Sequence, residues 1–384
     1  MAALSGSGCN PLSDSRRIVI KIGSALLIDT DTGQIRTAWL DSLSRDIRDL
    51  ARAGKDVILV SSGAVALGRE RLGLTGNCLT LSEKQACAAA GQALLTQAYE
   101  RALSQHNIVT AQALLTLDDT ENRRRWLNAR ETLGTLLSVS AVPIINENDT
   151  VATDEIRYGD NDRLAARTAQ MVGADRLILL SDIDGLYNTD PRTSPDAVHI
   201  AKVSALPDEI MAMAGQANSS AHVGSGGMAT KLVAADIAMK AGCHMCIMDG
   251  NASAPLSRLQ SGATATWFIP SQAPRDARRQ WISGSLKPKG DLVIDTGATV
   301  ALSHGKSLLA IGVTDVSGSF NKGDAVRIIN MNGNEIARGL VNYGSESARK
   351  IKRRNSSDIV SILGFTNGPT LVHRDNLVMH EGNP

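Results

Sequence analysis

The segment Arg17-Ile-Val-Ile-Lys-Ile-Gly-Ser24 decides the fold class of this chain. Its aliphatic run predicts a buried strand, and its closing Gly-Ser pair predicts a tight turn at the carboxyl end of that strand. Residues 37–53 then predict an amphipathic helix. A second aliphatic strand, Asp56-Val-Ile-Leu-Val-Ser-Ser62, follows and again ends in a glycine, Gly63. Because a helix joins two buried strands, we expect the strands to lie parallel in one sheet.

The same alternation of strands and helices continues over the first two-thirds of the chain. One long helix is predicted to begin at Ser82, where Gln85 would complete a capping box. Further helices are predicted at residues 121–138, after Asp162 and at residues 230–241, with buried strands at residues 108–115, 142–146, 176–181 and 243–248. The pattern predicts an α/β fold whose open, mostly parallel sheet is sandwiched by helices.

The chain changes character after Ile269, where a Pro- and Arg-rich stretch, SQAPRDARRQ, begins. Short strand-like runs separated by glycine turns follow it, at residues 291–295, 325–329 and 359–363. They predict a small β-rich domain. The expected organisation is a disordered tail at residues 1–15, an α/β domain at residues 16–274, a linker at residues 275–288 and the β-rich domain at residues 289–384.

Composition is that of an ordinary soluble globular protein. Hydrophobic residues make up 43% and charged residues 21% of the 384 residues, a balance typical of folded domains. No apolar run reaches the roughly 18 residues that a membrane span needs, and the N-terminus lacks the apolar stretch of a signal peptide. The cysteines are few and odd in number, which indicates reduced thiols; they are Cys9, Cys78, Cys87, Cys243 and Cys246.

The net charge of +1 hides an asymmetry between the two predicted domains. From residue 275 onward, Lys and Arg outnumber Asp and Glu by 15 to 10, whereas the preceding part carries 25 against 29. A basic domain suggests a nucleic-acid partner. A basic surface without any partner is an equal alternative.

Two phosphate-binding fingerprints are excluded. The P-loop pattern GxxxxGK[ST] is absent, because Val300 stands where Gly305-Lys-Ser307 would need its first glycine. Gly224-Ser-Gly-Gly-Met-Ala229 fits the GxGxx[GA] pattern of dinucleotide-binding folds, with Asp249 farther on. That pattern requires a strand directly before it. Residues 217–222 are polar and turn-like instead, so we do not expect a dinucleotide fold.

The same glycines are a candidate phosphate cradle. Their backbone N–H groups are unshielded, and Thr230-Lys231 opens a helix whose N-terminus attracts anions. A flexible surface loop would explain this segment equally well. The strands that end at Gly23 and Gly63 favour the cradle, because ligands of open α/β sheets gather at the carboxyl ends of strands.

Polar residues also cluster after a later strand. Asn146-Glu-Asn-Asp149 closes the strand at residues 142–146, and Gly159-Asp-Asn-Asp-Arg163 opens the next helix. Turn and N-cap chemistry is one interpretation of these residues. The functional interpretation is a polar nest for a zwitterion, with carboxylates for an ammonium group and amides for a carboxylate.

No metal site held by protein ligands is expected. Cys243-His-Met-Cys246 has the spacing of a zinc half-site, but it lies within an aliphatic strand and has no second pair of ligands. A buried structural pair of thiols is the favoured interpretation.

Several segments, in order, resemble the amino-acid kinase family, and within it the members that phosphorylate the side-chain carboxylate of free glutamate in proline biosynthesis. The segments are VIKIGSALL, VILVSSGAVALGRE, VPIINENDTVATDEI, YGDNDRLAA, LILLSDIDGLYNTDPR and GSGGMATKLVAADIAMKAG. The resemblance covers nearly all of the chain from Arg16. Near the C-terminus, DTGATVAL, FNKGDAVRI and VHRDNLV resemble the PUA domain that many bacterial members carry.

Residue roles follow from this resemblance. Lys21 and Lys231 match two lysines that reach the transferring phosphoryl group, and Asp162 matches the aspartate that holds both. The matched substrate-binding positions are Ser62, Gly63, Asn146, Asp149 and Asn161. The matched ATP-binding positions are Lys21, Gly23, Ser181, Asp182, Ser225, Gly226, Gly227, Met228, Ala229, Thr230 and Lys231. One departure is Ala25, which stands where relatives commonly have a hydroxyl group.

The resemblance also implies ligands and partners. ATP and L-glutamate would be the substrates, with Mg²⁺ accompanying ATP as the cofactor. A cytoplasmic homotetramer inhibited by proline is implied, with a glutamyl-phosphate reductase as a candidate recipient of the reactive acyl phosphate. N-acetylglutamate kinase, aspartokinase and uridylate kinase share the fold, but they should lack the PUA module and the paired INENDTVATDEI and YGDNDR motifs. An RNA-binding or RNA-modifying protein is the alternative from another class, and it would leave the kinase motifs unexplained.

Overall fold

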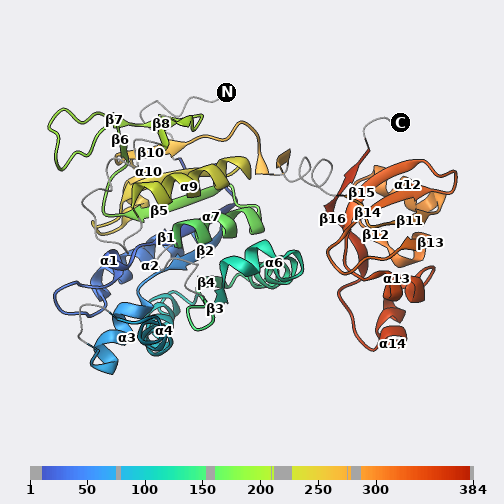
Figure 1. Ribbon diagram of the computed structural model, residues 1–384, viewed down its shortest axis with the longest axis horizontal. Coiled ribbons are helices and arrows are strands. Elements are labelled where there is room, and N and C mark those ends of the chain that lie inside the picture. Colours follow the sequence, from blue (N-terminus) through green and yellow to red (C-terminus); the bar gives the residue numbers. More distant parts are fainter. Residues whose placement is uncertain are drawn as a thin grey trace. The chain divides into compact units, whose positions relative to one another are not determined.

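A computed structural model describes residues 11–74, 79–152, 161–208, 210–211, 227–274, 276–277 and 287–380 of the chain. Contacts within the chain divide it into two compact units, Met1–Pro274 and Arg275–Pro384. Each unit has its own sheet and its own hydrophobic core (Figure 1).

The larger unit is built on an eight-stranded sheet with the order β3-β4-β2-β1-β5-β9-β10-β8. Its strands are β1 Arg17–Ile22, β2 Asp56–Ser61, β3 Thr110–Leu115, β4 Val142–Glu147, β5 Arg176–Ser181, β8 Lys202–Val203, β9 His244–Asp249 and β10 Ala265–Phe268. The first six strands in this order run parallel, and β10 is antiparallel to β9. β6 Leu186–Tyr187 and β7 His199–Ile200 pair separately. The expected α/β fold with a mostly parallel sheet is confirmed.

Helices cover both faces of this sheet (Figure 1). They are α1 Ser24–Leu27, α2 Thr37–Arg52, α3 Ala64–Leu72, α4 Leu81–Ser104, α5 Leu117–Glu121, α6 Arg123–Ser138, α7 Asn161–Val172, α9 Met228–Lys240 and α10 Pro255–Gln260. Ile18, Ile20 and Ile22 of β1 share one core with residues of α2, α4 and α10. Side chains alternate along a strand, so Lys21 points to the opposite face, where α7 packs against β1 and α9.

The order of the strands places a topological switch point at β1. This strand pairs with β2 on one side and with β5 on the other, and the chain visits the β2 side before the β5 side. At such a switch point the loops after neighbouring strands diverge and leave room for a ligand at the carboxyl ends. Those ends carry Gly23, Ser62, Asn146 and Ser181.

The predicted start of the long helix is wrong by one residue, and the predicted capping box is wrong by two. Helix α4 begins at Leu81, and its capping box uses Thr80 and Glu83 in place of Ser82 and Gln85. The Thr80 hydroxyl accepts from the Glu83 N–H at 3.3 Å, and the Glu83 carboxylate accepts from the Thr80 N–H at 2.7 Å. Both candidate pairs have the capping-box spacing, and the backbone conformation at Thr80 selects the first.

Part of the expected disordered tail is folded. Leu12 is fully buried in the core of the larger unit. Lys55 Nζ donates to the carbonyl groups of Ser13 and Ser15 at 2.9 and 2.6 Å. Residues 1–10 of the expected tail lie outside the described residues. One buried leucine and a few backbone contacts are therefore enough to order residues 11–15.

The smaller unit contains a six-stranded sheet with the order β12-β16-β15-β14-β11-β13, which confirms a β-rich domain. Its elements are β11 Gly290–Ile294, α12 Thr296–Ser303, β12 Leu308–Leu309, η1 Ala310–Gly312, β13 Val313–Gly318, β14 Ala325–Asn330, β15 Glu335–Val341, α13 Ser345–Ile351, η2 Ser356–Asp358, α14 Ile359–Leu363 and β16 Thr370–Met379. All neighbouring strands are antiparallel except β11 and β14.

The predicted strand at residues 359–363 is wrong, because these residues form helix α14. Ile359 is buried, Val360 is exposed, and Gly364 ends the helix in the left-handed region with φ 77°. A short apolar run does not distinguish a strand from a helical turn. Gly364 was the overlooked signal, because glycine is the usual residue just after a helix end.

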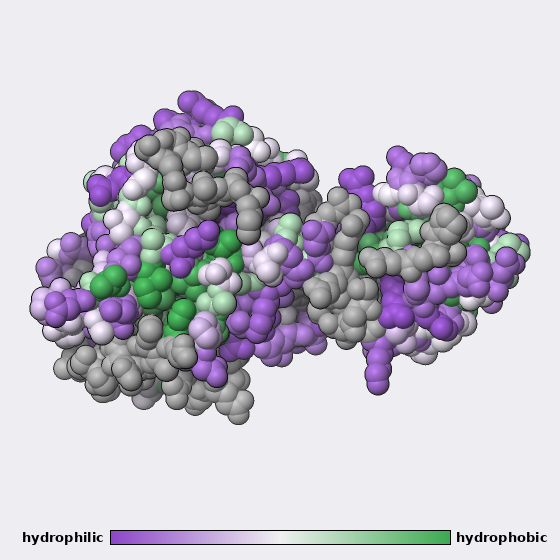
Figure 2. All heavy atoms as spheres, turned by 90° about the horizontal axis from the view of Figure 1, so that it is seen from above, coloured by the Kyte–Doolittle hydropathy of each residue, from purple (hydrophilic) through white to green (hydrophobic). Residues whose placement is uncertain are grey.

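The surface is mixed in polarity. On the face that Figure 2 shows, hydrophobic residues gather near the middle of the larger unit, between hydrophilic ones. Large exposed hydrophobic side chains include Val109, Val139 and Met331, and single residues of this kind are ordinary on protein surfaces. Within the described ranges, no helix has both the length and the apolar character needed to cross a bilayer.

Candidate active site

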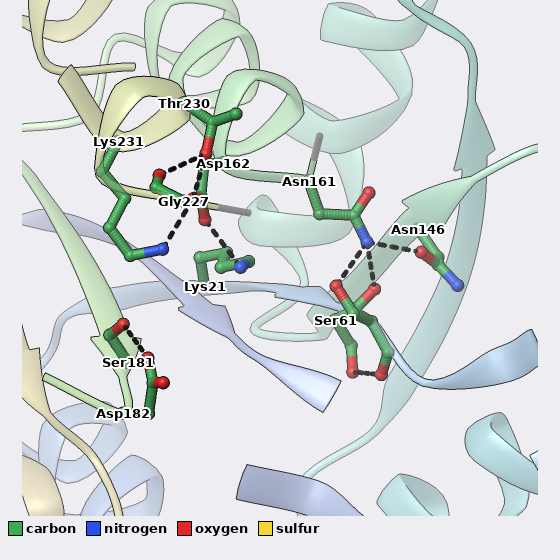
Figure 3. A network of polar contacts seen from close by, with 11 residues as sticks. Lys21, Ser61, Asn146, Asn161, Asp162, Ser181, Asp182, Gly227, Thr230 and Lys231 are labelled. Carbon is green, nitrogen blue, oxygen red and sulfur yellow. Dashed lines mark hydrogen bonds and ion pairs between the residues drawn. The ribbon is translucent and has the colours of Figure 1, made fainter. Parts of the chain in front are cut away.

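Two lysines and one aspartate meet at the carboxyl end of β1 (Figure 3). Lys21 Nζ lies 2.6 Å from Asp162 Oδ1, and Lys231 Nζ lies 3.0 Å from Asp162 Oδ2. All three residues are buried, and Asp162 is fully inaccessible. Because one carboxylate serves two ammonium groups, the cluster keeps an excess of positive charge.

Three elements position this cluster. β1 supplies Lys21, the first turn of α7 supplies Asp162 and the first turn of α9 supplies Lys231. Burial opposes ionisation of Asp162, but the two ammonium groups outweigh it and hold the pKa of this carboxyl below its usual value. The start of α7 also favours the negatively charged form of Asp162, because the N-terminus of a helix attracts anions.

Helix α9 begins beside the cluster. Its N-cap is Gly227, which has no side chain to cap the first N–H groups of the helix. Thr230 Oγ1 donates to the Gly227 carbonyl at 2.8 Å and lies 3.2 Å from Asp162 Oδ2. Met228 and Ala229 form the rest of the first turn. An uncapped helix N-terminus next to two lysines is suited to phosphate oxygens.

The other residues expected to bind ATP lie at neighbouring strand ends. Gly23 follows β1 and is the N-cap of α1. Ser181 closes β5, and its hydroxyl donates to Asp182 Oδ1 at 3.1 Å (Figure 3). Ser225 and Gly226 lie outside the described residues. The described members of this set therefore occupy the ends of β1 and β5 and the start of α9.

Asn161, the residue before Asp162, makes a second group of contacts (Figure 3). Its Nδ2 donates to Ser62 Oγ at 2.7 Å, to the Ser61 carbonyl at 3.0 Å and to Asn146 Oδ1 at 3.0 Å. Asn146 and Asn161 are buried. Adjacent helix residues point about 100° apart. The start of α7 therefore contributes to two groups of side chains, the lysine cluster through Asp162 and, through Asn161, a candidate amide subsite made of Ser62, Asn146 and Asn161.

Gly63 allows the sharp turn that follows β2. Its φ of 114° lies in the left-handed region, which side chains disfavour. A Cβ at this position would also lie 2.7 Å from Cδ1 of Ile28. Glycine is therefore required here for α3 to start directly beside Ser62.

Asp149 lies in the loop after β4 and is half-buried. Burial raises the pKa of its carboxyl to about 6. No hydrogen bond or ion pair joins it to another residue that the structure describes. A carboxylate desolvated in this way would gain strongly from an ammonium group placed beside it.

The sequence analysis missed two supporting residues on α4. Gln92 Oε1 accepts from Asn146 Nδ2 at 2.7 Å. The Tyr99 hydroxyl lies 2.8 Å from Ser61 Oγ, and burial raises the pKa of this phenol. Their spacing of two helical turns places both side chains on one face of α4. The spacing of Gln92 and Tyr99 can be read from the sequence. The sequence does not show that this face of α4 meets the ends of β2 and β4.

Metal-ligating side chains are not grouped in the described part of the chain. No cluster of three or more His, Cys, Asp or Glu residues suited to an ion occurs there. Cys243 and Cys246 are buried free thiols, and burial raises the pKa of both. Buried neutral thiols pack like small hydrophobic side chains.

The arrangement supports transfer of an anionic group between two bound molecules. The lysine cluster and the start of α9 can hold phosphate oxygens. The amide subsite and Asp149 can hold a molecule that carries both carboxylate and ammonium groups. Asn161 and Asp162 are consecutive residues, so the two bound molecules would meet over the start of α7.

Comparison with known proteins identifies relatives of both units. The model of the amino acid kinase family matches residues 16–249, and the PUA domain model matches residues 290–363. Glutamate 5-kinase of Paramagnetospirillum magneticum is 56% identical over 370 residues, covering 96% of this chain and 99% of that protein. Glutamate 5-kinase of Caulobacter vibrioides is 56% identical over 365 residues, covering 95% and 97%. Among solved structures, carbamate kinase from Giardia lamblia matches with 17% identity and a TM-score of 0.47, covering 67% of this chain and 100% of that one.

Proposed function

Because the chain belongs to the amino acid kinase family, and within it to the glutamate 5-kinases, we propose that it transfers the γ-phosphate of ATP to the side-chain carboxylate of L-glutamate. The product would be L-glutamyl 5-phosphate. One observation carries the proposal: Lys21 and Lys231 share Asp162 beside the uncapped start of α9, and the amide subsite adjoins them through Asn161.

This chemistry needs no general base. The attacking group is a carboxylate with a reference pKa of about 4.3, so it is already ionised near neutral pH. The obstacle is repulsion between this carboxylate and the phosphates, together with the need to align them. Lys21 and Lys231 would neutralise charge on the transferring phosphoryl oxygens. Asp162 would hold both ammonium groups in place before either substrate binds.

The amide subsite suits the amino-acid end of glutamate. Ser62 Oγ accepts from Asn161, so its O–H could donate to a carboxylate, and Asn161 Oδ1 could accept from an ammonium group. Asp149 offers a desolvated carboxylate to an ammonium group. Glutamate bound in this way would extend its side chain toward the lysine cluster, across the first turn of α7.

Mg²⁺ would arrive as part of the nucleotide substrate. It binds readily to phosphate oxygens, keeps several waters and neutralises charge on the phosphates. In the lysine cluster the Asp162 carboxylate is already engaged by Lys21 and Lys231, and the preceding residue, Asn161, contributes an amide. They suit a nucleotide that brings its own metal ion.

Substrate choice is tested by offering Mg-ATP with glutamate, aspartate or N-acetylglutamate and trapping any acyl phosphate with hydroxylamine. We expect hydroxamate from glutamate and little from the other two, because the subsite provides for a free ammonium group and a longer side chain. Hydroxamate from aspartate alone would overturn the assignment to glutamate.

Family resemblance supports further expectations about regulation. We propose a cytoplasmic homotetramer that proline inhibits and that delivers its acyl phosphate to a glutamyl-phosphate reductase in proline biosynthesis. Sedimentation of the purified chain tests the tetramer. Titration of proline into the hydroxamate assay tests the inhibition.

The PUA domain is a second candidate binding unit, with RNA as its proposed partner. The segment that ends α13 is strongly basic, and Arg349, Lys350, Arg353 and Arg354 are all exposed. Exposed cations of this kind bind phosphate backbones with an affinity that falls as salt rises. Filter binding over a salt series tests the proposal, and retention that does not change with salt would contradict it.

Replacing Asp149 by asparagine should raise the KM for glutamate and leave the KM for ATP nearly unchanged. A lost charge-assisted contact is worth roughly 1.5–3 kcal/mol, or about 10- to 100-fold. The wild-type KM for glutamate should also rise as pH falls through about 6, because the carboxyl is neutral below its raised pKa. The variant should lack this pH dependence. A larger change in the KM for ATP than in the KM for glutamate would show that Asp149 does not bind glutamate. Asp118→Asn, at an exposed aspartate, is the matched control.

A chain that ends at Pro274 should fold and retain kinase activity. The larger unit has a complete sheet and core up to that residue, and every residue proposed for chemistry precedes it. Circular dichroism reports the fold, and the hydroxamate assay reports activity. A folded but inactive truncated chain would show that the PUA domain completes the active site.

A further inference from the structure

Helix α4 carries a row of polar side chains behind the amide subsite. Gln85, Gln92 and Tyr99 follow one another at intervals of two helical turns, so they lie on nearly one face. Each bonds to a segment that carries a proposed glutamate-binding residue: Gln85 to the carbonyl of Ala152 at 3.0 Å, Gln92 to Asn146 at 2.7 Å and Tyr99 to Ser61 at 2.8 Å.

Helix α4 can reach these segments because it packs very closely on α3. A Cβ at Gly91, the residue before Gln92, would lie 1.8 Å from the carbonyl oxygen of Ala64. A Cβ at Gly68 would lie 1.8 Å from the carbonyl oxygen of Cys87. Glycine at both positions lets the two backbones touch. The position of Gln92 relative to the ends of β2 and β4 is therefore set by rigid backbone contacts.

Backbone groups determine which way the buried amides point. The Glu147 N–H can only donate, and it lies 2.9 Å from Asn146 Oδ1, so the Asn146 oxygen faces it. The Asn146 nitrogen then faces Gln92 Oε1. The Ser61 carbonyl can only accept, so the Asn161 nitrogen faces it and the Asn161 oxygen points away. The two backbone atoms favour this polarity, and Gln92 supplies the acceptor that the Asn146 nitrogen needs in it.

This polarity leaves defined groups available to a ligand. Ser62 Oγ accepts from Asn161, so its own O–H is available to donate. Asn161 Oδ1 is available to accept. Gln92 is buried, and its Nε2 has no hydrogen-bond partner within the described part of the chain. The Ser62 hydroxyl, as a donor for a carboxylate, and the Asn161 oxygen, as an acceptor for an ammonium group, suit an amino acid.

We propose that Gln92 is a positioning residue for the amino-acid substrate, acting through Asn146. By accepting from Asn146 Nδ2, it keeps Asn146 Oδ1 turned toward Asn161 and thereby keeps the Asn161 oxygen turned toward the ligand. Without Gln92, Asn146 Nδ2 would be buried without an acceptor, a state that buried amides avoid by changing rotamer. This inference rests on the proposed glutamate kinase activity.

Gln92→Met tests the inference, because methionine keeps the length of the side chain and removes the acceptor. We expect the KM for glutamate to rise about tenfold, with kcat and the KM for ATP within about twofold of wild type. Gln97→Met is the matched control, because Gln97 is an exposed glutamine on the same helix. If Gln92→Met does not fold, Gln92→Asn can be used instead. The shorter side chain keeps an amide but no longer reaches Asn146, so the same rise in the KM for glutamate is expected.

A double-mutant cycle separates positioning from simple support of the fold. In an Asn146→Ala background, adding Gln92→Met should change the KM for glutamate less than twofold, because the residue through which Gln92 acts is gone. Additive effects would overturn the inference, and so would a lower melting temperature with an unchanged KM. If the wild-type chain forms no hydroxamate from glutamate, both the proposed function and this inference are overturned. If the wild type is active and the Gln92→Met variant has an unchanged KM for glutamate, only this inference is overturned.

Discussion

Replacing Lys231 by alanine should lower kcat by about 10²- to 10³-fold while changing the KM for glutamate little. Charge on the phosphoryl oxygens must be held most tightly in the transition state, so the loss of one stabilising group is felt mainly in kcat. Lys21→Ala should behave in the same way, because Lys21 and Lys231 occupy equivalent positions on the two oxygens of Asp162. Initial rates from the hydroxamate assay, at saturating ATP, give both parameters.

Helix α9 offers a matched control for this result. Lys240 lies on the same helix, is exposed and pairs with Asp236 on the surface, so Lys240→Ala should keep kcat within about twofold of wild type. Near-normal turnover in Lys231→Ala or Lys21→Ala would remove that lysine from the mechanism. A large rise in the glutamate KM at unchanged kcat would assign the lysine to ground-state binding instead.

Replacing Asp162 by asparagine should damage both activity and stability. The substitution keeps the shape of the side chain but takes away the buried carboxylate that the Lys21 and Lys231 ammonium groups share. Breaking a buried ion pair by removing one partner costs roughly 3–5 kcal/mol. We expect a clearly lower melting temperature of the larger unit and a kcat at least as low as that of Lys231→Ala.

A second substitution distinguishes charge repulsion from a simple packing defect. Adding Lys21→Met to Asp162→Asn removes one of the two cations that have lost their shared carboxylate, so part of the lost stability should return while activity stays low. Differential scanning calorimetry follows the stability, and Asp236→Asn on the surface of α9 is the control. An Asp162→Asn variant that melts like the wild type would show that the cluster does not depend on this carboxylate.

Several properties of this protein were determined by local sequence. The alternation of aliphatic strands with amphipathic helices predicted the parallel sheet, because buried strands and helices leave different periodicities. Glycine after β1 and β2, at Gly23 and Gly63, predicted ligand sites at the strand ends, and Gly63 does adopt the left-handed conformation that glycine permits. The change of pattern after Ile269 predicted a separate β-rich unit. Each of these signals resides in a short stretch of chain.

Signals that depend on a choice between local alternatives were less reliable. Two overlapping pairs could cap α4, and the chain uses Thr80 with Glu83. Residues 359–363 are apolar enough for a strand, yet they form a helix because Gly364 can end it. Leu12 gave no periodic signal, and its burial depends on a pocket formed by residues far along the chain. For Leu12 the deciding energy comes from packing that the segment itself does not contain. The other two choices depend on the local backbone conformation, at Thr80 and at Gly364.

Only the tertiary structure decided how the candidate site is assembled. Asn161 donates to the Ser61 carbonyl across 100 positions of sequence, and Gln92 accepts from Asn146 across 54. Lys231 reaches Asp162 across 69 positions. These contacts depend on the order of the strands and on the close approach of α3 and α4, neither of which leaves a periodic trace in the sequence. Residue types and local periodicity therefore determined which groups were available for chemistry. Long-range backbone packing decided which of them meet and, through hydrogen bonds that can point only one way, which atoms remain available to a ligand.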